Sequence, residues 1–238
     1  PGPTRKESSA APEVYKRQLL ERSETSKSPV DTLAKQKILT LNPLQIDRSP
    51  LEDFDFFQTK PKILNEEQAS ALKKVLKSLK NEIFQTHLLH GVTGSGKTEV
   101  YLQAIEYARS KNQGVILLVP EIALTSQTIE RLKSRFSEKL GILHCRLSDG
   151  ERFDIWHGIR KGEISIVVGA RSAIFSPVQN LGLIIVDEEH ENSYKQVEEE
   201  PCYHARDIAI MRAKFSNLTV ILGSAIPSLE SYLKAQQG

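Results

Sequence analysis

One short segment, residues 91–98, limits the possible folds of this chain more than any other feature. Its sequence, GVTGSGKT, follows a strand-like apolar run (FQTHLLHG) and precedes a helix-like run (EVYLQAIEYA). A strand, a glycine-rich turn ending in Gly-Lys-Thr and a helix together indicate a P-loop, whose backbone binds phosphate groups. We therefore expect the N–H groups of Gly94, Ser95, Gly96 and Lys97 to converge on phosphate oxygens at the positive end of the helix.

The rest of the chain alternates short apolar runs, rich in β-branched residues, with helical stretches. This alternation predicts an α/β fold, with a mostly parallel sheet and helices on both of its faces. Strands are expected at residues 115–119, 164–168, 183–187 and 218–222, and helices at 126–138, 150–161 and 204–215.

Residues 1–60 differ from residues 61–238, because they are polar, rich in Lys, Ser and Pro, and hold only short apolar runs. Two interpretations stay open for them: a small helical module with a linker, or a partly disordered lead-in. Met211 is the only methionine, and the chain stops at ESYLKAQQG soon after a recognisable motif. We therefore expect the sequence to be an internal piece of a longer protein.

Composition narrows the functional class only slightly. The net charge of +2 does not by itself indicate a nucleic-acid partner, so any DNA contact requires a local patch. No apolar run reaches about 18 residues, and the N-terminus lacks the apolar core of a secretory signal. We expect a cytoplasmic protein with no membrane partner. Cys145 and Cys202 lack paired C-x-x-C spacing, so this chain predicts no zinc site.

A second motif, LIIVDEEH, supplies the acidic group that a P-loop requires. Its apolar strand ends in Asp187, where a carboxylate can share a Mg²⁺ ion with the hydroxyl of Thr98. Lys97 is expected to reach the β- and γ-phosphates, and Gly91 to open the phosphate-binding loop. Glu188 is expected to orient or deprotonate the attacking water. Together these residues predict ATP and Mg²⁺ as cofactors and ATP hydrolysis as the reaction.

The acidic motif, Asp187-Glu188-Glu189-His190, also resembles the D-E-x-H box of superfamily 2 helicases. Six segments in the same order narrow the resemblance to the bacterial primosomal replication-restart helicases, the primosomal protein N′ family. The resemblance implies a RecA-like first motor lobe, preceded by a winged-helix-like remnant in residues 1–60. The segments, within about residues 62–235, are LLVPEIALT, LSDGER, GARSAIFSP, DEEHENSYKQ, YHARD and LGSAIPSLES.

The resemblance implies contacts to single-stranded DNA from two of these segments. Pro120, Thr125 and Gln127 match one segment that touches the strand backbone, and Arg171 and Ser172 match another. Hydroxyl, amide and guanidinium groups can bind phosphates in this way without reading sequence. For Arg171, a solvated surface charge is the alternative.

The stretch SYKQVEEEPCYHARD resembles the aromatic-rich loop of the family. Tyr194, Lys195, Tyr203, His204 and Arg206 are therefore expected to stack on bases and pair with phosphates. Because the loop joins the acidic motif directly, it is expected to report DNA binding to the ATP site. A long surface loop with two exposed tyrosines is the alternative.

Four further positions carry an implied role or a departure from it. Gln68 matches the glutamine that reads adenine in such helicases, with a surface helix glutamine as the alternative. His190 and Ser224 match residues that couple hydrolysis to DNA movement. The helicase motif usually written Ser-Ala-Thr has Ile226 at its third position, which removes a hydroxyl from that coupling.

The resemblance implies an ATP-dependent 3′-to-5′ DNA helicase that restarts stalled forks by loading the primosome. Its expected partners are single-stranded and forked DNA, primosome proteins and single-strand-binding proteins. The second lobe, its arginine finger and the zinc-binding cysteines of the family are expected only in a missing C-terminal part. Alone, the chain is expected to bind nucleotide but hydrolyse it poorly. The remaining alternative is a nucleotide-binding interaction module. A transporter ATPase does not fit the motif order, and a GTPase would need an N-K-x-D motif, which this sequence lacks.

Overall fold

The structure, a computed structural model, describes residues 32–33, 35–36, 59–124, 126–145, 147–197 and 200–237. Contacts divide the chain into two units, residues 1–46 and 47–238, and every element named below belongs to the second. The winged-helix-like remnant expected in residues 1–60 lies outside the described residues, apart from residues 32–33, 35–36 and 59–60. That remnant, and the domain boundary expected after residue 60, stay predictions.

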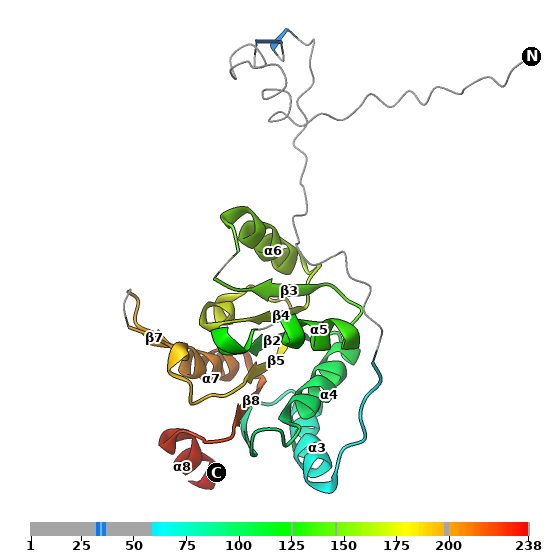
Figure 1. The fold of residues 1–238 in the computed structure, drawn as a ribbon, viewed down its shortest axis with the longest axis vertical. Helices are drawn as coiled ribbons and strands as arrows, with labels where there is room; N and C mark the ends of the chain where they lie inside the picture. The colour runs from blue at the N-terminus through cyan, green and yellow to red at the C-terminus, as the bar shows by residue number, and fades with distance from the viewer. Residues whose placement is uncertain are drawn as a thin grey trace, which may run out of the picture. The chain divides into compact units, whose positions relative to one another are not determined.

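Six strands form a sheet in which every neighbouring pair runs parallel (Figure 1). The parallel sheet confirms the predicted α/β fold, and all four expected strands are present. β3 is absent from the sequence prediction, because its four residues, LGIL, are too short to show a strand pattern. In spatial order the strands are β1 (Gln85–His90), β8 (Thr219–Ser224), β5 (Leu181–Val186), β2 (Gly114–Leu118), β4 (Ile166–Gly169) and β3 (Leu140–Leu143).

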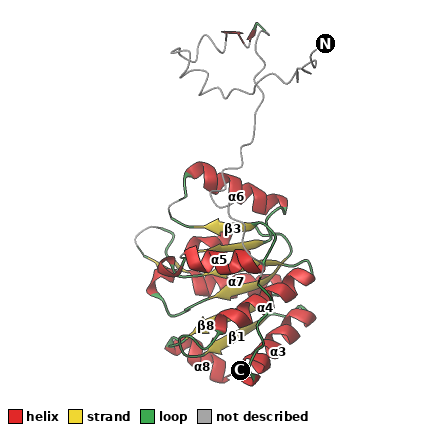
Figure 2. Cartoon of the chain, turned by 45° about the vertical axis from the view of Figure 1, so that its right-hand side comes forward, coloured by secondary structure: helices red, strands yellow, loops and turns green. Residues whose placement is uncertain are grey.

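Helices cover both faces of this sheet, because successive strand residues point to opposite sides. Val115 and Leu117 of β2 pack in a core with α3, α4 and α5. Ile116 and Leu118 point the other way and pack with α6, α7 and η2. Figure 1 shows α3 and α4 on one side of the strands and α7 on the other, and Figure 2 shows the strands between the helices. The bounds are α3 Glu66–Asn81, α4 Lys97–Ser110, α5 Ser126–Arg135, α6 Asp149–Lys161, α7 Ala205–Ser216 and η2 Arg171–Phe175.

Local sequence explains where two of these helices begin and end. Asn65 and Gln68 form a capping box before α3, and Ser148 and Glu151 form another before α6. α6 ends at Gly162, whose φ of 81° is the left-handed conformation that glycine adopts without strain.

The carboxyl ends of the parallel strands share one edge of the sheet, where ligands of α/β folds usually bind. β1 leads there into the P-loop, β5 leads into the Asp-Glu-Glu-His turn, and β8 lies between them. The fold therefore brings the two nucleotide motifs to the same edge, on either side of β8.

The remaining elements are short and lie mainly in the connections. None of the helices within the described part of the chain is long and apolar enough to cross a membrane. The short elements in the connections are η1 Glu121–Ala123, η3 Asn192–Tyr194, the antiparallel pair β6 Lys195–Gln196 and β7 Tyr203–His204, and α8 Leu229–Gln237.

Candidate nucleotide and nucleic-acid site

The P-loop depends on glycine at two positions with positive φ. Gly94 has φ 80°, and Gly96, which caps the N-terminus of α4, has φ 84°. A Cβ atom at Gly96 would also lie 2.4 Å from Nε2 of Gln68. Any other residue at position 96 would be strained and would displace the Gln68 side chain. The loop therefore keeps its backbone exposed at the N-terminus of α4, as phosphate binding requires.

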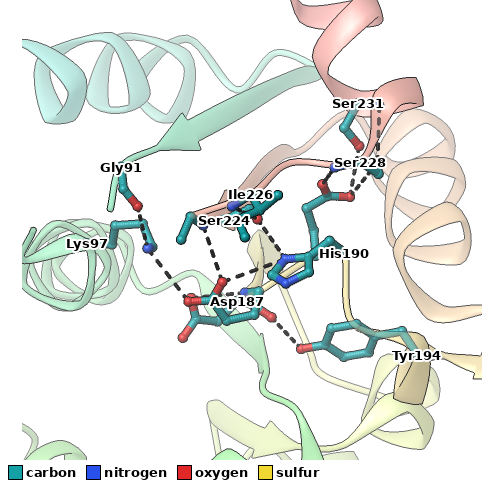
Figure 3. Close-up of polar contacts among 12 residues, drawn as sticks. Gly91, Lys97, Asp187, His190, Tyr194, Ser224, Ile226, Ser228 and Ser231 are labelled. Atoms are coloured by element: carbon teal, nitrogen blue, oxygen red, sulfur yellow. Dashed lines mark hydrogen bonds and ion pairs between the residues drawn. The ribbon is translucent and has the colours of Figure 1, made fainter. Parts of the chain in front are cut away.

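Lys97, the first residue of α4, points back across the loop that precedes it (Figure 3). Its ammonium donates a hydrogen bond to the carbonyl oxygen of Gly91 at 2.8 Å. The same nitrogen lies 3.6 Å from Oε1 of Glu188. The side chain is buried, so the ammonium is held between these two oxygen atoms rather than extended into solvent.

Asp187 follows β5 directly and is held from several sides. Its Oδ1 accepts hydrogen bonds from the hydroxyl of Tyr101 at 3.0 Å and from the N–H of Glu188 at 3.1 Å. Burial raises the pKa of Asp187; the bond from Tyr101 opposes the rise, and the charge of Glu188 adds to it. Burial and then the charge of Asp187 raise the pKa of Tyr101, so its phenol remains a donor at neutral pH.

Glu188 occupies the left-handed region with φ 46°, which is uncommon for a residue other than glycine. This turn directs its carboxylate back toward the P-loop. Oε1 lies near Lys97, and Oε2 accepts a hydrogen bond from the N–H of Ala225 at 3.3 Å. Strain of this kind is common at functional sites, where the surrounding structure holds it in place.

These groups open into a single hollow of about 630 Å³. Lys97, Thr98, Asp187 and Glu188 line one part of it. The donor set fits a nucleotide with Mg²⁺, because a glycine cradle, an ammonium, a hydroxyl and a partly buried carboxylate converge there. The wall also carries four further basic residues: Lys60, Lys62, Arg131 and Arg135.

Gln68 lies against the P-loop, beside the hollow. Its Nε2 donates to the carbonyl oxygen of Ser95 at 2.7 Å, and its Oε1 accepts from the N–H of Asn65 at 2.9 Å. The amide therefore already supports the loop and the start of α3. One amide hydrogen and one carbonyl lone pair remain by valence for a base. Adenine recognition by Gln68 stays a prediction.

Residues 62–229 match the model of the family described as type III restriction enzyme, res subunit (ResIII). The chain belongs to the ResIII family.

Among curated proteins, the chain is similar to replication restart proteins. The replication restart protein PriA of Chlamydia trachomatis serovar D is 52% identical over 222 residues, which cover 92% of this chain and 29% of the relative. PriA of Bacillus subtilis (strain 168) is 47% identical over 221 residues, which cover 93% and 27% respectively. The chain thus spans less than a third of these relatives. The similarity confirms the resemblance to replication-restart helicases carried by the six segments.

A solved structure of RecG bound to a three-way DNA junction shares the fold of the ResIII lobe. The match has a TM-score of 0.56 and 25% identity, and it covers 74% of this chain and 23% of RecG. It supports the RecA-like fold inferred from the parallel sheet and the P-loop.

Some residues expected to contact DNA do come together in this ResIII lobe. Arg171, at the start of η2, donates from Nη1 to the carbonyl oxygen of Lys195 at 3.2 Å. Phe175, at the end of η2, meets Tyr203 edge-on with ring centroids 5.1 Å apart. Two segments distant in sequence therefore share one surface, and Ser172, which lies in η2, is exposed. Phe175 is 49% exposed. It is missing from the sequence prediction because no motif singled it out as a functional residue.

Other expected DNA contacts have different positions. Tyr194 is 1% exposed, and its hydroxyl donates to the backbone carbonyl of Asp187 at 2.7 Å (Figure 3). A ring buried in this way has no face on which a base can stack, so the expected stacking by Tyr194 does not fit the structure. Pro120 precedes η1. Thr125 and the side chain of Gln127 lie outside the described residues.

Arg206 and His204 face inward more than the sequence predicts. Nη1 of Arg206 donates to Glu189 at 2.9 Å and to the hydroxyl of Ser228 at 2.7 Å. His204 caps α7, and its Nδ1 accepts from the N–H of Arg206 at 3.3 Å. Burial and then the charge of Arg206 lower the pKa of His204, which keeps the ring neutral near pH 7. Phosphate pairing by Arg206 would require it to leave a carboxylate partner.

Glu189 is the buried residue of the acidic motif and is missing from the sequence prediction. It accepts from the N–H and hydroxyl of Ser228 at 2.7 and 3.1 Å, and from the hydroxyl of Ser231 at 2.9 Å. Burial would raise the pKa of Glu189, but these bonds and the one from Arg206 outweigh it, so the pKa is lowered. Glu189 thereby ties the acidic motif to α7 and to the start of α8.

Proposed function

We propose that this chain is the ATP-binding first motor lobe of a DNA helicase that acts in bacterial replication restart. One observation carries the proposal: Lys97 from the P-loop and Glu188 from the acidic motif meet at 3.6 Å across the hollow that Thr98 and Asp187 also line. A P-loop lysine facing two acidic residues at the carboxyl edge of a parallel sheet is the arrangement that phosphoryl transfer requires.

Each residue then has a distinct task. The N–H groups of the P-loop and the ammonium of Lys97 would bind the phosphates, and Thr98 and Asp187 would hold Mg²⁺. When bound, Mg²⁺ supplies positive charge to the transferring phosphoryl group. Lys97 would exchange its contact with Glu188 for a phosphate oxygen. That exchange would release Glu188 to orient the attacking water and accept its proton.

The second part of the proposal concerns DNA. Arg171, whose guanidinium contacts the backbone of Lys195, comes from the same short helix as Phe175, which meets Tyr203 edge-on, so cationic and aromatic residues come from the same two segments. Such a surface suits the phosphates and base faces of a single strand and does not need to read sequence. The similarity to replication restart proteins and to junction-bound RecG supports single-stranded and forked DNA as the ligand. Primosome and single-strand-binding proteins in the cytoplasm are the partners that this role implies.

A second candidate is a nucleotide-binding module that never turns over ATP alone. The same hollow would serve such a module. The two functions differ in their response to DNA, because a motor lobe completed by its partner lobe hydrolyses ATP faster when a strand is bound. A passive module would show no change.

Calorimetry with ADP and Mg²⁺ tests the proposal. Lys97→Ala should weaken nucleotide binding by at least tenfold, because a buried charge-assisted contact to phosphate is lost. Lys111→Ala, at the exposed far end of the same helix, is the matched control and should bind as the parent chain does. Equal affinity in the parent chain and Lys97→Ala would rule out the P-loop as the nucleotide site.

A further inference from the structure

Tyr101 is a buried side chain that contacts the proposed metal-binding carboxylate, and no sequence motif identifies it. It lies on α4, three residues after Thr98, and is 2% exposed. Its hydroxyl donates to Oδ1 of Asp187 at 3.0 Å, although the two residues are 86 positions apart in sequence. α4 thus supplies both the hydroxyl of Thr98 and a second hydroxyl that holds the partner carboxylate.

The strand between the two motifs also leaves room for this phenol. A Cβ atom at Gly223 of β8 would lie 1.5 Å from the Tyr101 hydroxyl oxygen, 2.7 Å from Cζ and 3.4 Å from Oδ1 of Asp187. The close approach, rather than any unusual φ, therefore requires glycine at position 223. The phenol is enclosed by α4, the backbone of β8 and the residue that follows β5.

Apolar packing alone does not require this hydroxyl. Val100, Ala104 and Ile105 of α4 already fill the core beneath the sheet, and a phenylalanine ring would occupy the same volume as Tyr101. The hydroxyl adds one directed bond to one carboxylate oxygen. The terminal torsion of an aspartate is otherwise broad, so this bond limits how the carboxylate can rotate.

We propose that Tyr101 is a positioning residue that fixes the Asp187 carboxylate for Mg²⁺, with Gly223 preserving the space that the phenol needs. The inference rests on the proposed nucleotide site. Mg²⁺ demands near-octahedral geometry at 2.0–2.1 Å, so a carboxylate that rotates binds it less well. Partners that orient a metal ligand typically change metal affinity by 10–100-fold when they are removed.

Tyr101→Phe tests the inference, because it removes the hydroxyl and keeps the ring. ADP binding is measured over a Mg²⁺ titration, then again in EDTA, together with the melting temperature of the nucleotide-free chain. We expect the Mg²⁺ midpoint to rise about tenfold. ADP affinity in EDTA and the melting temperature should stay at the values of the parent chain. Tyr107→Phe, which removes a phenol hydroxyl from the far end of α4, should leave all three measurements unchanged.

Two results would overturn the inference. An unchanged Mg²⁺ midpoint in Tyr101→Phe would show that the hydroxyl does not act on the metal site. An equal loss of ADP affinity with and without Mg²⁺ would show that Tyr101 only supports the fold. If the parent chain bound no ADP in Mg²⁺, the proposed nucleotide site and the inference would fail together. If the parent chain bound ADP normally but Tyr101→Phe gave either of these two results, only the inference would fail.

Two further variants keep the test decisive. Gly223→Ala should raise the Mg²⁺ midpoint in the same direction, because the new methyl group would push the phenol away from Asp187. A normal midpoint in Gly223→Ala would contradict the role given to the phenol. If Tyr101→Phe did not fold, Tyr101→Met would replace it, since methionine fills irregular space without a hydroxyl.

Discussion

The hydroxyl of Ser224 lies 2.7 Å from Nδ1 of His190, which joins the end of β8 to the turn that follows β5 (Figure 3). The same hydroxyl accepts a hydrogen bond from the N–H of Ile226 at 3.0 Å. The Ile226 side chain is 73% exposed, so the hydroxyl missing at this position does not belong to the contact between the two motifs. Ser224 keeps that contact in spite of the departure from Ser-Ala-Thr.

We therefore expect two substitutions in this segment to change the free energy of unfolding by different amounts. Ser224→Ala should lower the free energy of unfolding by about 1–2 kcal/mol, because it leaves a His190 nitrogen and the N–H of residue 226 without their partner. Ile226→Thr changes an exposed side chain and should stay within about 0.5 kcal/mol. Urea denaturation of both variants checks this. A larger loss in Ile226→Thr than in Ser224→Ala would contradict the assignment.

ATP hydrolysis by this chain should be slow even with saturating single-stranded DNA. At the proposed site, Lys97 and Mg²⁺ would neutralise only part of the charge on the transferring phosphoryl group, and an arginine from a second lobe would supply the rest. Fingers of this kind contribute about 10³–10⁵ in rate in GTPases. Phosphate release is compared between this chain and one extended through a second lobe. Equal rates would place the missing cation within residues 1–238 and refute the proposed division between lobes.

Weak and salt-sensitive binding of single-stranded DNA is expected from a net charge of +2. Phe175→Ala should weaken binding by about fivefold or more at every salt concentration, because it removes a stacking face. Arg171→Ala should instead reduce the salt slope by about 0.7, the value for one phosphate contact on a single strand. Fluorescence anisotropy across a salt series separates the two effects.

A matched control for the aromatic contact lies elsewhere on the surface. Phe153 on α6 is also exposed, and it stacks on His157 with ring centroids 4.1 Å apart. Phe153→Ala should leave DNA affinity unchanged. If it weakened binding as much as Phe175→Ala, the surface formed by η2 and the β6–β7 pair would not be the strand contact.

Glu189→Gln should destabilise the fold by about 3–5 kcal/mol, because it leaves the charge of Arg206 without its buried partner. Glu230→Gln, on the exposed side of α8, is the control and should change little. The pKa of Glu189 is lowered on folding from 4.5, so its contribution is fully present above about pH 4.5 and is lost as the pH falls through the folded pKa. Chemical denaturation between pH 3 and pH 7 should therefore show a flatter profile in the variant. Parallel profiles would show that Glu189 is not the group responsible.

Local patterns were sufficient for the parts of this molecule that local chemistry determines. The P-loop, the strand ending at Asp187 and the helix that begins at Lys97 each carry their signal within a few residues. The alternation of strands and helices was enough to predict a parallel sheet covered on both faces. The sequence did not predict β3, because four residues are too few to establish a hydrophobic period.

Long-range contacts explain what the sequence could not predict. Glu189 is separated from Ser228 by 39 positions, and Tyr101 from Asp187 by 86, so no spacing rule connects them. Tyr194 is of a residue type that often stacks on bases at a surface. In this fold, however, its hydroxyl donates to a backbone carbonyl and its ring is buried. Whether an aromatic residue is presented or enclosed depends on tertiary packing rather than on its neighbours in sequence.

β8 acts mechanically as a spacer between the two halves of the proposed nucleotide site. It pairs with β1 over six residues and with β5 over four, so the roots of the P-loop and of the acidic turn are fixed two strand spacings apart, about 9.6 Å. Widening that separation would mean breaking a hydrogen-bonded ladder in the middle of the sheet. At the proposed nucleotide site, exchange of nucleotide would then proceed through side-chain and loop motion above a stiff base. A motor lobe built in this way would transmit force through the sheet without loosening its hold on the phosphates.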